Sequence, residues 1–175
     1  MPMVEITTTK GALDEAAKQR LAGELSTLAL ALEAAPMVDF SDAEHMQALA
    51  WCFVNEQEVF VGGRVPAKPI YRVTVTLPEG APGLLGPLAG RGREKLVKRV
   101  TAAVLAAEGS ENTMVEAHRI WVHVRQITDG HWAGFGEVFT VADATAYGLQ
   151  ADEPGSRTDR VRQAALESVG AITAG

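Results

Sequence analysis

The pattern of hydrophobic and polar residues predicts a strand and then a helix at the start of the chain. Residues 3–9, MVEITTT, alternate with Val4 and Ile6 on one side, which is typical of a half-buried strand. The next segment predicts a helix with Asp14 as its N-cap, because apolar residues recur at spacings of four, three and four. These apolar residues are Leu21, Leu25, Leu28 and Leu32. Pro36 follows them, as expected beyond a helix end.

Two further elements complete this first unit. Residues 47–54, QALAWCFV, are nearly all apolar and predict a second strand. Residues 58–63, EVFVGG, end in two glycines and predict a short hairpin. The first unit is therefore a strand, a helix, a strand and a hairpin.

The same order of patterns then recurs. Residues 70–77, IYRVTVTL, alternate like a strand, and a loop rich in proline and glycine is expected over 78–92. A second helix has the same four-three-four spacing of apolar residues, at Leu96, Val100, Ala103 and Ala107. Residues 119–127, RIWVHVRQI, predict a fourth strand, and residues 129–137, DGHWAGFGE, predict a hairpin that matches the first.

This repeat, with a period of about seventy residues, indicates a duplicated β-α-β unit. Strands within each unit are then expected to be parallel, with right-handed crossovers. The predicted fold class is α+β: a mixed four-stranded sheet with two helices on one face, short hairpins and a C-terminal helix. Trp121, His123 and Arg125 alternate away from the helix side of their strand, so we expect them to face a partner or a site.

The two units predict one domain over residues 2–137, divided into residues 2–63 and 70–137. Residues 138–175 are interpreted as a linker rich in glycine and aspartate, followed by a helix at 156–172. We expect this helix to pack as an arm on a neighbouring subunit.

Composition and charge exclude several classes of protein. The chain is 47% hydrophobic and 22% charged, as is ordinary for a globular protein, and its net charge of −6 gives no reason to expect nucleic-acid binding. Cys52 is the single cysteine, so no intramolecular disulfide is possible, and its apolar surroundings favour an inert thiol. No apolar run is long enough to span a membrane, which predicts a cytoplasmic protein. Metal-ligand spacing and phosphate-binding glycine loops are absent as well, so no metal and no cofactor are expected.

The start of the chain and its aromatic segments resemble the tautomerase superfamily, which is built on the β-α-β unit of 4-oxalocrotonate tautomerase. The resemblance rests on the opening Met-Pro, the strand and helix after it, and the closing GHWAGFGE. Two such units in one chain, with the segments ALAWCFVNEQEVFVGG and HRIWVHV, are most similar to the cis-3-chloroacrylic acid dehalogenase branch. The resemblance covers residues 2–137 and implies a homotrimer.

The resemblance assigns the chemistry to Pro2. Removal of Met1 would give Pro2 a secondary amine, and an unperturbed α-amino group titrates only slightly above neutrality. Burial in an apolar pocket, or a nearby positive charge, lowers its pKa further. The neutral amine is then a general base for carbon next to a carbonyl, and the charged amine is a general acid for hydration, dehalogenation or decarboxylation.

The resemblance also implies arginines that hold a substrate carboxylate at a junction between loop and helix. The first unit has Ala12 there, whereas the second has Arg91 and Arg93 after a long loop that could act as a flap. Solvated arginines at a helix start are the structural alternative, although cations are mildly unfavourable there. Arg72 and Arg125 are further candidates. The dehalogenases have arginines directly after the strand, where this chain has PEGAPG.

Aromatic and polar strand residues complete the candidate site. His123 matches a pocket-lining position that is tyrosine in the dehalogenase, and Trp121 shares its face. Trp132 matches the aromatic wall of the pocket, and trimer packing is the alternative role for it. The water-activating glutamate of the dehalogenase falls near Gly134, which cannot serve. The weaker candidates are Glu44, His45 and Glu137.

Two functions remain open at this point. The first is a cofactor-independent tautomerase-like enzyme with Pro2 and His123 as catalytic residues. Its substrate would be a small keto or unsaturated acid, bound by Arg91, Arg93, Arg72, Arg125, Trp121 and Trp132. The second is a non-catalytic oligomeric member of the same fold that serves in binding or structure. Retention of Met1 would exclude the first, because the Pro2 nitrogen would then be an amide without a basic lone pair.

Overall fold

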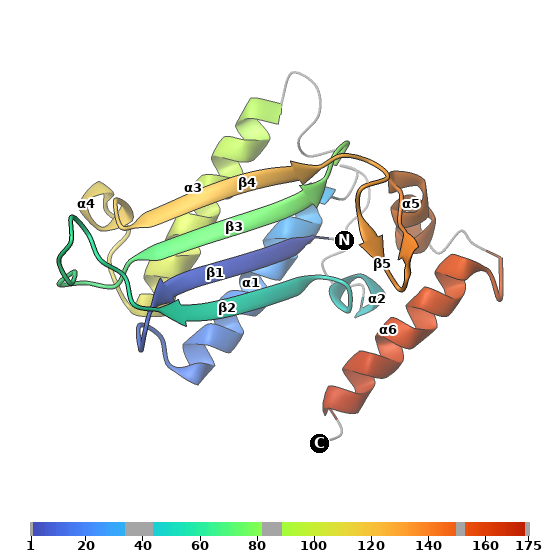
Figure 1. The fold of residues 1–175 in the computed structure, drawn as a ribbon, viewed down its shortest axis with the longest axis horizontal. Coiled ribbons are helices and arrows are strands. Elements are labelled where there is room, and N and C mark those ends of the chain that lie inside the picture. The colour runs from blue at the N-terminus through green and yellow to red at the C-terminus, as the bar shows by residue number, and fades with distance from the viewer. Residues whose placement is uncertain (1, 34–43, 82–88, 150–152, 174–175) are drawn as a thin grey trace.

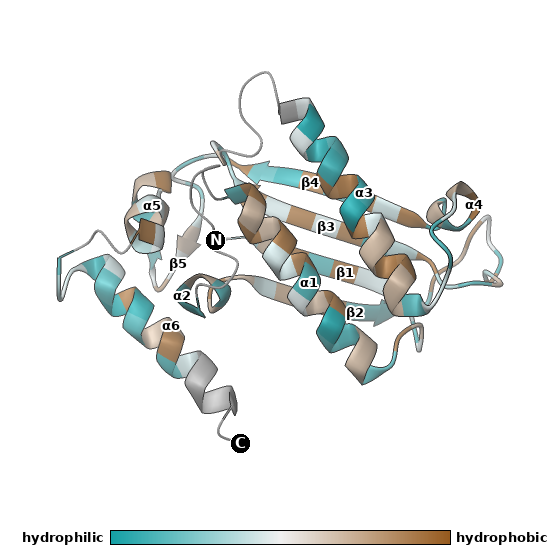
Figure 2. Cartoon of the chain, turned by 180° about the vertical axis from the view of Figure 1, so that it is seen from behind, coloured by the Kyte–Doolittle hydropathy of each residue, from teal (hydrophilic) through white to brown (hydrophobic). Residues whose placement is uncertain are grey.

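A four-stranded sheet with two long helices on one face forms the centre of the protein (Figures 1 and 2). The computed structural model describes residues 2–33, 44–81, 89–149 and 153–173. The strands are β1 (Met3–Thr9), β2 (Trp51–Gln57), β3 (Tyr71–Pro78) and β4 (Ile120–Ile127). The two long helices are α1 (Glu15–Glu33) and α3 (Ala89–Glu108). This is the α+β architecture that the sequence predicts.

The strand order β2-β1-β3-β4 confirms the duplication. β1 pairs with β2 in parallel, and β3 pairs with β4 in parallel, so each unit contributes two neighbouring strands. β1 and β3 meet in antiparallel orientation at the centre, where the two units join. The carboxyl ends of β3 and β4 therefore lie at the same edge of the sheet as the start of β1.

The main hydrophobic core lies between the sheet and the two helices. Alternate residues of β1 and β3 are buried, including Val4, Ile6, Val73 and Val75. The stripes of α1 and α3 lie against them, and Leu21 and Leu96 are 1% and 3% exposed. The four apolar positions of α3 follow those of α1 at a constant offset of 75 residues. Asp14 caps α1 as predicted, because its Oδ1 accepts a hydrogen bond from the Ala17 amide at 2.7 Å.

The predicted strand at 47–54 is wrong in its first half. A short helix, α2 (Glu44–Gln47), ends at the first of these residues, a turn follows over 48–49, and β2 begins only at Trp51. The segment before β2 leaves the sheet because Met46 and Leu49 are buried in a second hydrophobic cluster. An apolar run alone does not distinguish burial in a sheet from burial under a loop or short helix.

The loop predicted over 78–92 is shorter at its carboxyl end. The helix α3 begins at Ala89, so the expected helix boundary is four residues late. Residues 82–88, about half of the proposed flap, lie outside the described part of the chain, as does Pro36.

The segment after residue 137 is more structured than a linker. It forms α5 (Val141–Leu149) and α6 (Arg157–Thr173), and the predicted C-terminal helix is thereby confirmed. The predicted second hairpin is also present, as β5 (Ala133–Gly134) paired with β6 (Glu137–Val138). α5 and the first half of α6 pack on their own chain, through Tyr147, Val161 and Ala165, while the C-terminal end of α6 projects away from the sheet (Figure 1). The buried members of this second cluster are Leu30, Met46, Leu49, Phe139, Tyr147, Val161 and Ala165.

A buried ion-pair cluster closes the other end of the sheet, beside α4 (Met114–Ala117). Arg119 is 3% exposed and donates from Nη2 to Glu108 and to Glu116, both at 2.7 Å. Its Nη1 also donates to the carbonyl oxygen of Pro69 at 2.6 Å. Arg119 therefore joins the start of β3, the end of α3 and α4.

The predicted hairpin at 58–63 is a tight turn. Val61 and Arg64 exchange two backbone hydrogen bonds of 2.8 and 3.1 Å. Gly62 and Gly63 have φ values of 56° and 77°, a region that side-chain-bearing residues rarely adopt. Over the ranges that the structure describes, no helix combines the length and the apolar character needed to cross a membrane.

Candidate functional site

Pro2 lies at the edge of the sheet where β1 and β2 begin and where β3 and β4 end. We call this the Pro2 edge. Pro2 itself is buried, directly before the first residue of a central strand. The hairpin of β5 and β6 follows β4 directly and so arises at the Pro2 edge (Figure 1). α3 begins toward the same end of the sheet, but on the helix layer and on the β4 side, so its two arginines lie further from the chain start than the hairpin does (Figure 1).

The sheet face that carries no helices, here called the open face, holds the remaining candidates in three cross-strand rows. The row next to Pro2 contains Trp51, Met3, Thr76 and Arg125. The second row contains Phe53, Glu5, Thr74 and His123. The third row contains Asn55, Thr7, Arg72 and Trp121. Arg125 is therefore the open-face candidate nearest to Pro2, and His123 lies one row further away.

Arg72 and Trp121 lie too far from Pro2 to share a small ligand with it within one chain. Their row pairs with Thr7, five residues along β1 from Pro2, which is roughly 16 Å at about 3.3 Å per residue. Arg72 Nη2 donates to Thr7 Oγ1 at 3.2 Å, and the Trp121 side chain is 68% exposed. These two residues therefore form an exposed part of the open face.

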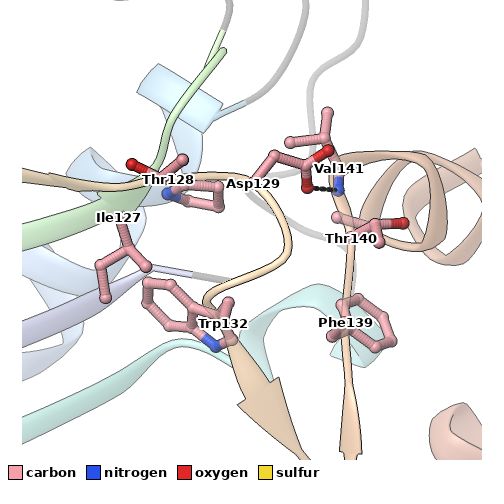
Figure 3. A pocket seen from close by; sticks show the side chains of 9 residues that line it. Ile127, Thr128, Asp129, Trp132, Phe139, Thr140 and Val141 are labelled. Carbon is pink, nitrogen blue, oxygen red and sulfur yellow. Dashed lines mark hydrogen bonds between the residues drawn. The ribbon is translucent and has the colours of Figure 1, made fainter.

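Trp132 forms one wall of a small hollow at the Pro2 edge (Figure 3). The hollow is lined by Pro78, Ile127, Thr128, Asp129, Trp132, Phe139, Thr140, Val141 and Ala144. The space open to water in it is about 10 Å³, which is close to the room that one water molecule needs. A larger ligand at this place therefore needs the hollow to widen.

Asp129 is a carboxylate of this hollow that the sequence reasoning missed. Its Oδ1 accepts hydrogen bonds from the Val141 amide at 2.8 Å and the Gly130 amide at 3.1 Å (Figure 3). The contact with Val141 ties the loop after β4 to the first turn of α5. The Asp-Gly pair signals a turn in the sequence, but nothing local indicates a partner twelve residues away.

Helix geometry separates the two arginines at the start of α3. Arg93 precedes Leu96 by three residues and Val100 by seven, so it shares the side of the helix that faces the sheet. Arg91 precedes Lys95 by four residues and lies on the opposite, solvent-facing side. Both are exposed. The phase of the helix therefore directs Arg93, rather than Arg91, toward the sheet.

The weaker acidic and histidine candidates have structural contacts. His45 lies in α2, and its carbonyl oxygen accepts a hydrogen bond from the Tyr147 hydroxyl at 2.5 Å. Its Nε2 is 3.4 Å from the carbonyl oxygen of Gly148, so the residue ties α2 to α5. Glu137 pairs with Arg157 Nε at 2.9 Å. Glu44 is exposed at the start of α2.

Cys52 does not add a nucleophile to the site. Burial raises the pKa of its thiol to about 11, because the apolar surroundings disfavour the charged thiolate. The thiol therefore stays protonated at neutral pH, in agreement with the inert cysteine that the sequence predicts.

Comparison with solved structures confirms that the chain has the fold of the tautomerase superfamily. One similar structure is N1, a member of the cis-3-chloroacrylic acid dehalogenase family, with a TM-score of 0.62 and 15% identity, covering 92% of this chain and 99% of N1. A macrophage migration inhibitory factor-like protein from Entamoeba histolytica has a TM-score of 0.56 and 16% identity, covering 79% of this chain and 98% of its own. A fused 4-OT, described as a symmetric trimer, has a TM-score of 0.56 and 20% identity, covering 81% and 98%. No protein-family model and no curated protein matches the sequence.

The likeness to N1 includes part of the C-terminal segment. Residues 1–137 make up about 78% of the chain, so a match over 92% must extend beyond them. The packing of α5 and α6 on α2 agrees with this, because it joins residues from both sides of position 137 in one hydrophobic cluster.

Proposed function

We propose that the protein is a cofactor-independent enzyme of the tautomerase type, with the amine of Pro2 as its general base or acid. The observation that carries this proposal is the position of Pro2, buried at the start of a central strand. A buried amine has a lowered pKa, because burial disfavours its charged form. The neutral amine can then remove a proton from carbon next to a carbonyl at neutral pH.

We further propose a small keto or unsaturated acid as the substrate. Arg93 at the start of α3 and Arg125 in the first open-face row supply cations on two sides of the Pro2 edge. Trp132 supplies an apolar wall there. A guanidinium binds a carboxylate through two parallel hydrogen bonds, which fixes the acid while its carbon chain meets the amine.

Assembly into a homotrimer belongs to the same proposal. The open face exposes large aromatic side chains, with Trp51 at 56%, Phe53 at 43% and Trp121 at 68%. Exposed apolar residues gathered on one sheet face mark an interface rather than a free surface. A partner on this face would place Trp121 and Arg72 of one chain near another chain, where they are within reach of a bound substrate.

Intact-mass measurement followed by a proline variant tests the proposal. Loss of Met1 should be visible as a mass lower by one methionine. Pro2→Ala should then reduce turnover of phenylenolpyruvate by at least roughly a hundred-fold, the usual contribution of a general acid or base. A tag that stays on the N-terminus should have the same effect, and the same tag on the C-terminus is the matched control.

Two outcomes contradict the assignment. A mass that includes Met1 would leave the Pro2 nitrogen as an amide, and the non-catalytic oligomeric reading of this fold would replace the enzyme. Full turnover in folded Pro2→Ala would show that another group moves the proton.

A further inference from the structure

The exposed side of α3 carries four cations in a single stripe. They are Arg91, Lys95, Lys98 and Arg99, at relative positions zero, four, seven and eight of the helix. These spacings place them on one face, opposite the buried residues Leu96, Val100 and Val104. All four are exposed, and the stripe runs for about 12 Å at 1.5 Å per residue. Figure 2 shows these polar first turns of α3 on the helix layer, away from the open face.

The first unit of the duplication shows that the fold does not require this stripe. The matching residues of α1, 75 positions earlier, are Ala16, Arg20, Gly23 and Glu24. They are also exposed, but their charges cancel. The same helix position therefore carries no net charge in one unit and four positive charges in the other, within a chain of net charge −6.

The stripe begins against the electrostatic preference of the helix. The N-terminus of a helix carries a partial positive charge, so Arg91 in the first turn of α3 is unfavourably placed, whereas Lys95, Lys98 and Arg99 lie beyond that turn. α3 has no acidic residue in its first turn and no basic residue in its last turn. Among the described residues, Lys98 is the one stripe cation with an ion-pair partner, Glu94 Oε1 at 2.6 Å. Exposed cations that remain mostly unpaired within the described part of the chain are available to an anion from outside it.

We propose that this stripe attracts small anionic substrates and guides them to the Pro2 edge. This inference rests on the proposed function, since it concerns the same site. The stripe begins toward that end of the sheet, where α3 starts, and it stays exposed when the open face is covered by other copies. A local cluster of like charges raises both the encounter rate and the local concentration of an opposite charge. The negative charge of the rest of the chain opposes long polyanions, which favours a small anion.

The test compares two triple variants of equal net charge. Lys95→Glu, Lys98→Glu and Arg99→Glu together reverse the stripe and leave Arg91 and Arg93 intact. The matched control reverses Lys10, Arg20 and Arg64, three exposed cations at or toward the opposite end of the sheet. Turnover is measured on phenylenolpyruvate, an anion, and on its neutral methyl ester, at low and at high salt.

We expect the stripe reversal to lower kcat/KM for the anion roughly ten-fold at low salt, with less than about a two-fold change at 0.5 M salt. The neutral ester and the control variant should be almost unaffected. Equal kcat/KM of the two variants on the anion would overturn the proposal. Binding of single-stranded DNA that is lost on stripe reversal, with unchanged kinetics, would overturn it in favour of a polyanion.

If the wild-type protein turns over neither substrate, the proposed function is refuted. Whether the stripe attracts anions is then tested by a binding measurement. Titration with 2-oxoglutarate, followed by NMR at low salt, should show weaker binding to the stripe variant than to the control. Equal affinity would overturn the stripe as an anion guide.

Discussion

Replacement of Arg119 by methionine should destabilise the protein strongly, although this residue lies at the end of the sheet away from Pro2. Arg119 is 3% exposed and binds two carboxylates and a backbone carbonyl. Methionine keeps the volume but leaves Glu108 without its cation, and Glu116 with Lys68 as its remaining partner. Removal of one partner from a buried ion pair costs about 3–5 kcal/mol. The carboxylate side chains are 11% and 17% exposed, so some rehydration is possible, and we expect the low end of this range.

Urea unfolding at pH 7 measures the loss directly. A loss of about 3 kcal/mol corresponds to a fall in Tm of roughly 6–12 °C for a chain of this size. Arg119→Lys is the control, because it keeps the charge but cannot bind both carboxylates through a planar fork. A loss below 1 kcal/mol in Arg119→Met would refute the reasoning, because the cluster would then contribute no more to the free energy of unfolding than a solvated surface ion pair does.

The acid dependence of stability gives a second readout of the same cluster. Hydrogen bonds from Lys68, and then from Arg119, hold the pKa of Glu116 below its ordinary value of 4.5. A lowered pKa in the folded state stabilises the protein above the unfolded pKa, and this stability is lost as the pH falls through the folded value. Stability of the wild type should therefore decline below about pH 4.5, and Arg119→Met should show a shallower decline.

Three further predictions concern the two faces of the sheet. Arg93→Ala should lower kcat/KM for a keto acid roughly ten- to a hundred-fold, since a charged hydrogen bond contributes about 1.5–3 kcal/mol, and Arg91→Ala should have a smaller effect. Trp121→Glu combined with Phe53→Ser should dissociate the oligomer, because both side chains are exposed on the open face, and sedimentation velocity measures the change. Iodoacetamide should label Cys52 of the folded protein very slowly at pH 8, since burial raises the pKa of the thiol to about 11.

Each of these predictions has a simple contrary result. Equal losses of kcat/KM in Arg93→Ala and Arg91→Ala would show that the side of α3 on which an arginine lies does not determine its role in substrate binding. A wild type that already sediments as a monomer would remove the open face as an interface. Rapid labelling of the folded protein, relative to the same protein in urea, would show that the thiol is accessible and ionised.

Much of the fold could be predicted because the duplication repeats each signal. The four-three-four stripe occurs in both long helices, and alternation marks β1, β3 and β4 along nearly their full lengths. Two independent copies of a pattern reduce the ambiguity that a short apolar run leaves on its own. The short helices before β2 and β4, and α5, carry no such stripe or alternation, and they were not predicted.

The second hydrophobic cluster explains the failures at α2 and α5. Met46 and Leu49 pack with Tyr147 and Phe139, about a hundred residues later in the chain. No local pattern encodes such a contact, so the apolar run before β2 resembled a strand and α5 resembled a linker. Candidate site residues posed a similar problem. The sequence places Arg91 and Arg93 at a helix start, and their spacing to Leu96 already puts them on different sides of α3, but their distance from Pro2 depends on the tertiary fold.

In the proposed enzyme the two units begin with different groups, which sets how many amine sites an assembly can hold. β3 begins the second unit as β1 begins the first, but the residues before it, Pro69 and Ile70, are inside the chain, and the Pro69 carbonyl oxygen accepts a hydrogen bond from Arg119. A peptide nitrogen has no basic lone pair, so only one of the two strand starts can provide an amine. An oligomer of this chain can therefore hold one amine site per chain rather than one per β-α-β unit. A reagent that reacts covalently with the Pro2 amine should accordingly stop at one equivalent per chain. The opposite end of the sheet, where β3 begins, contains the buried Arg119 ion-pair cluster instead of a second amine.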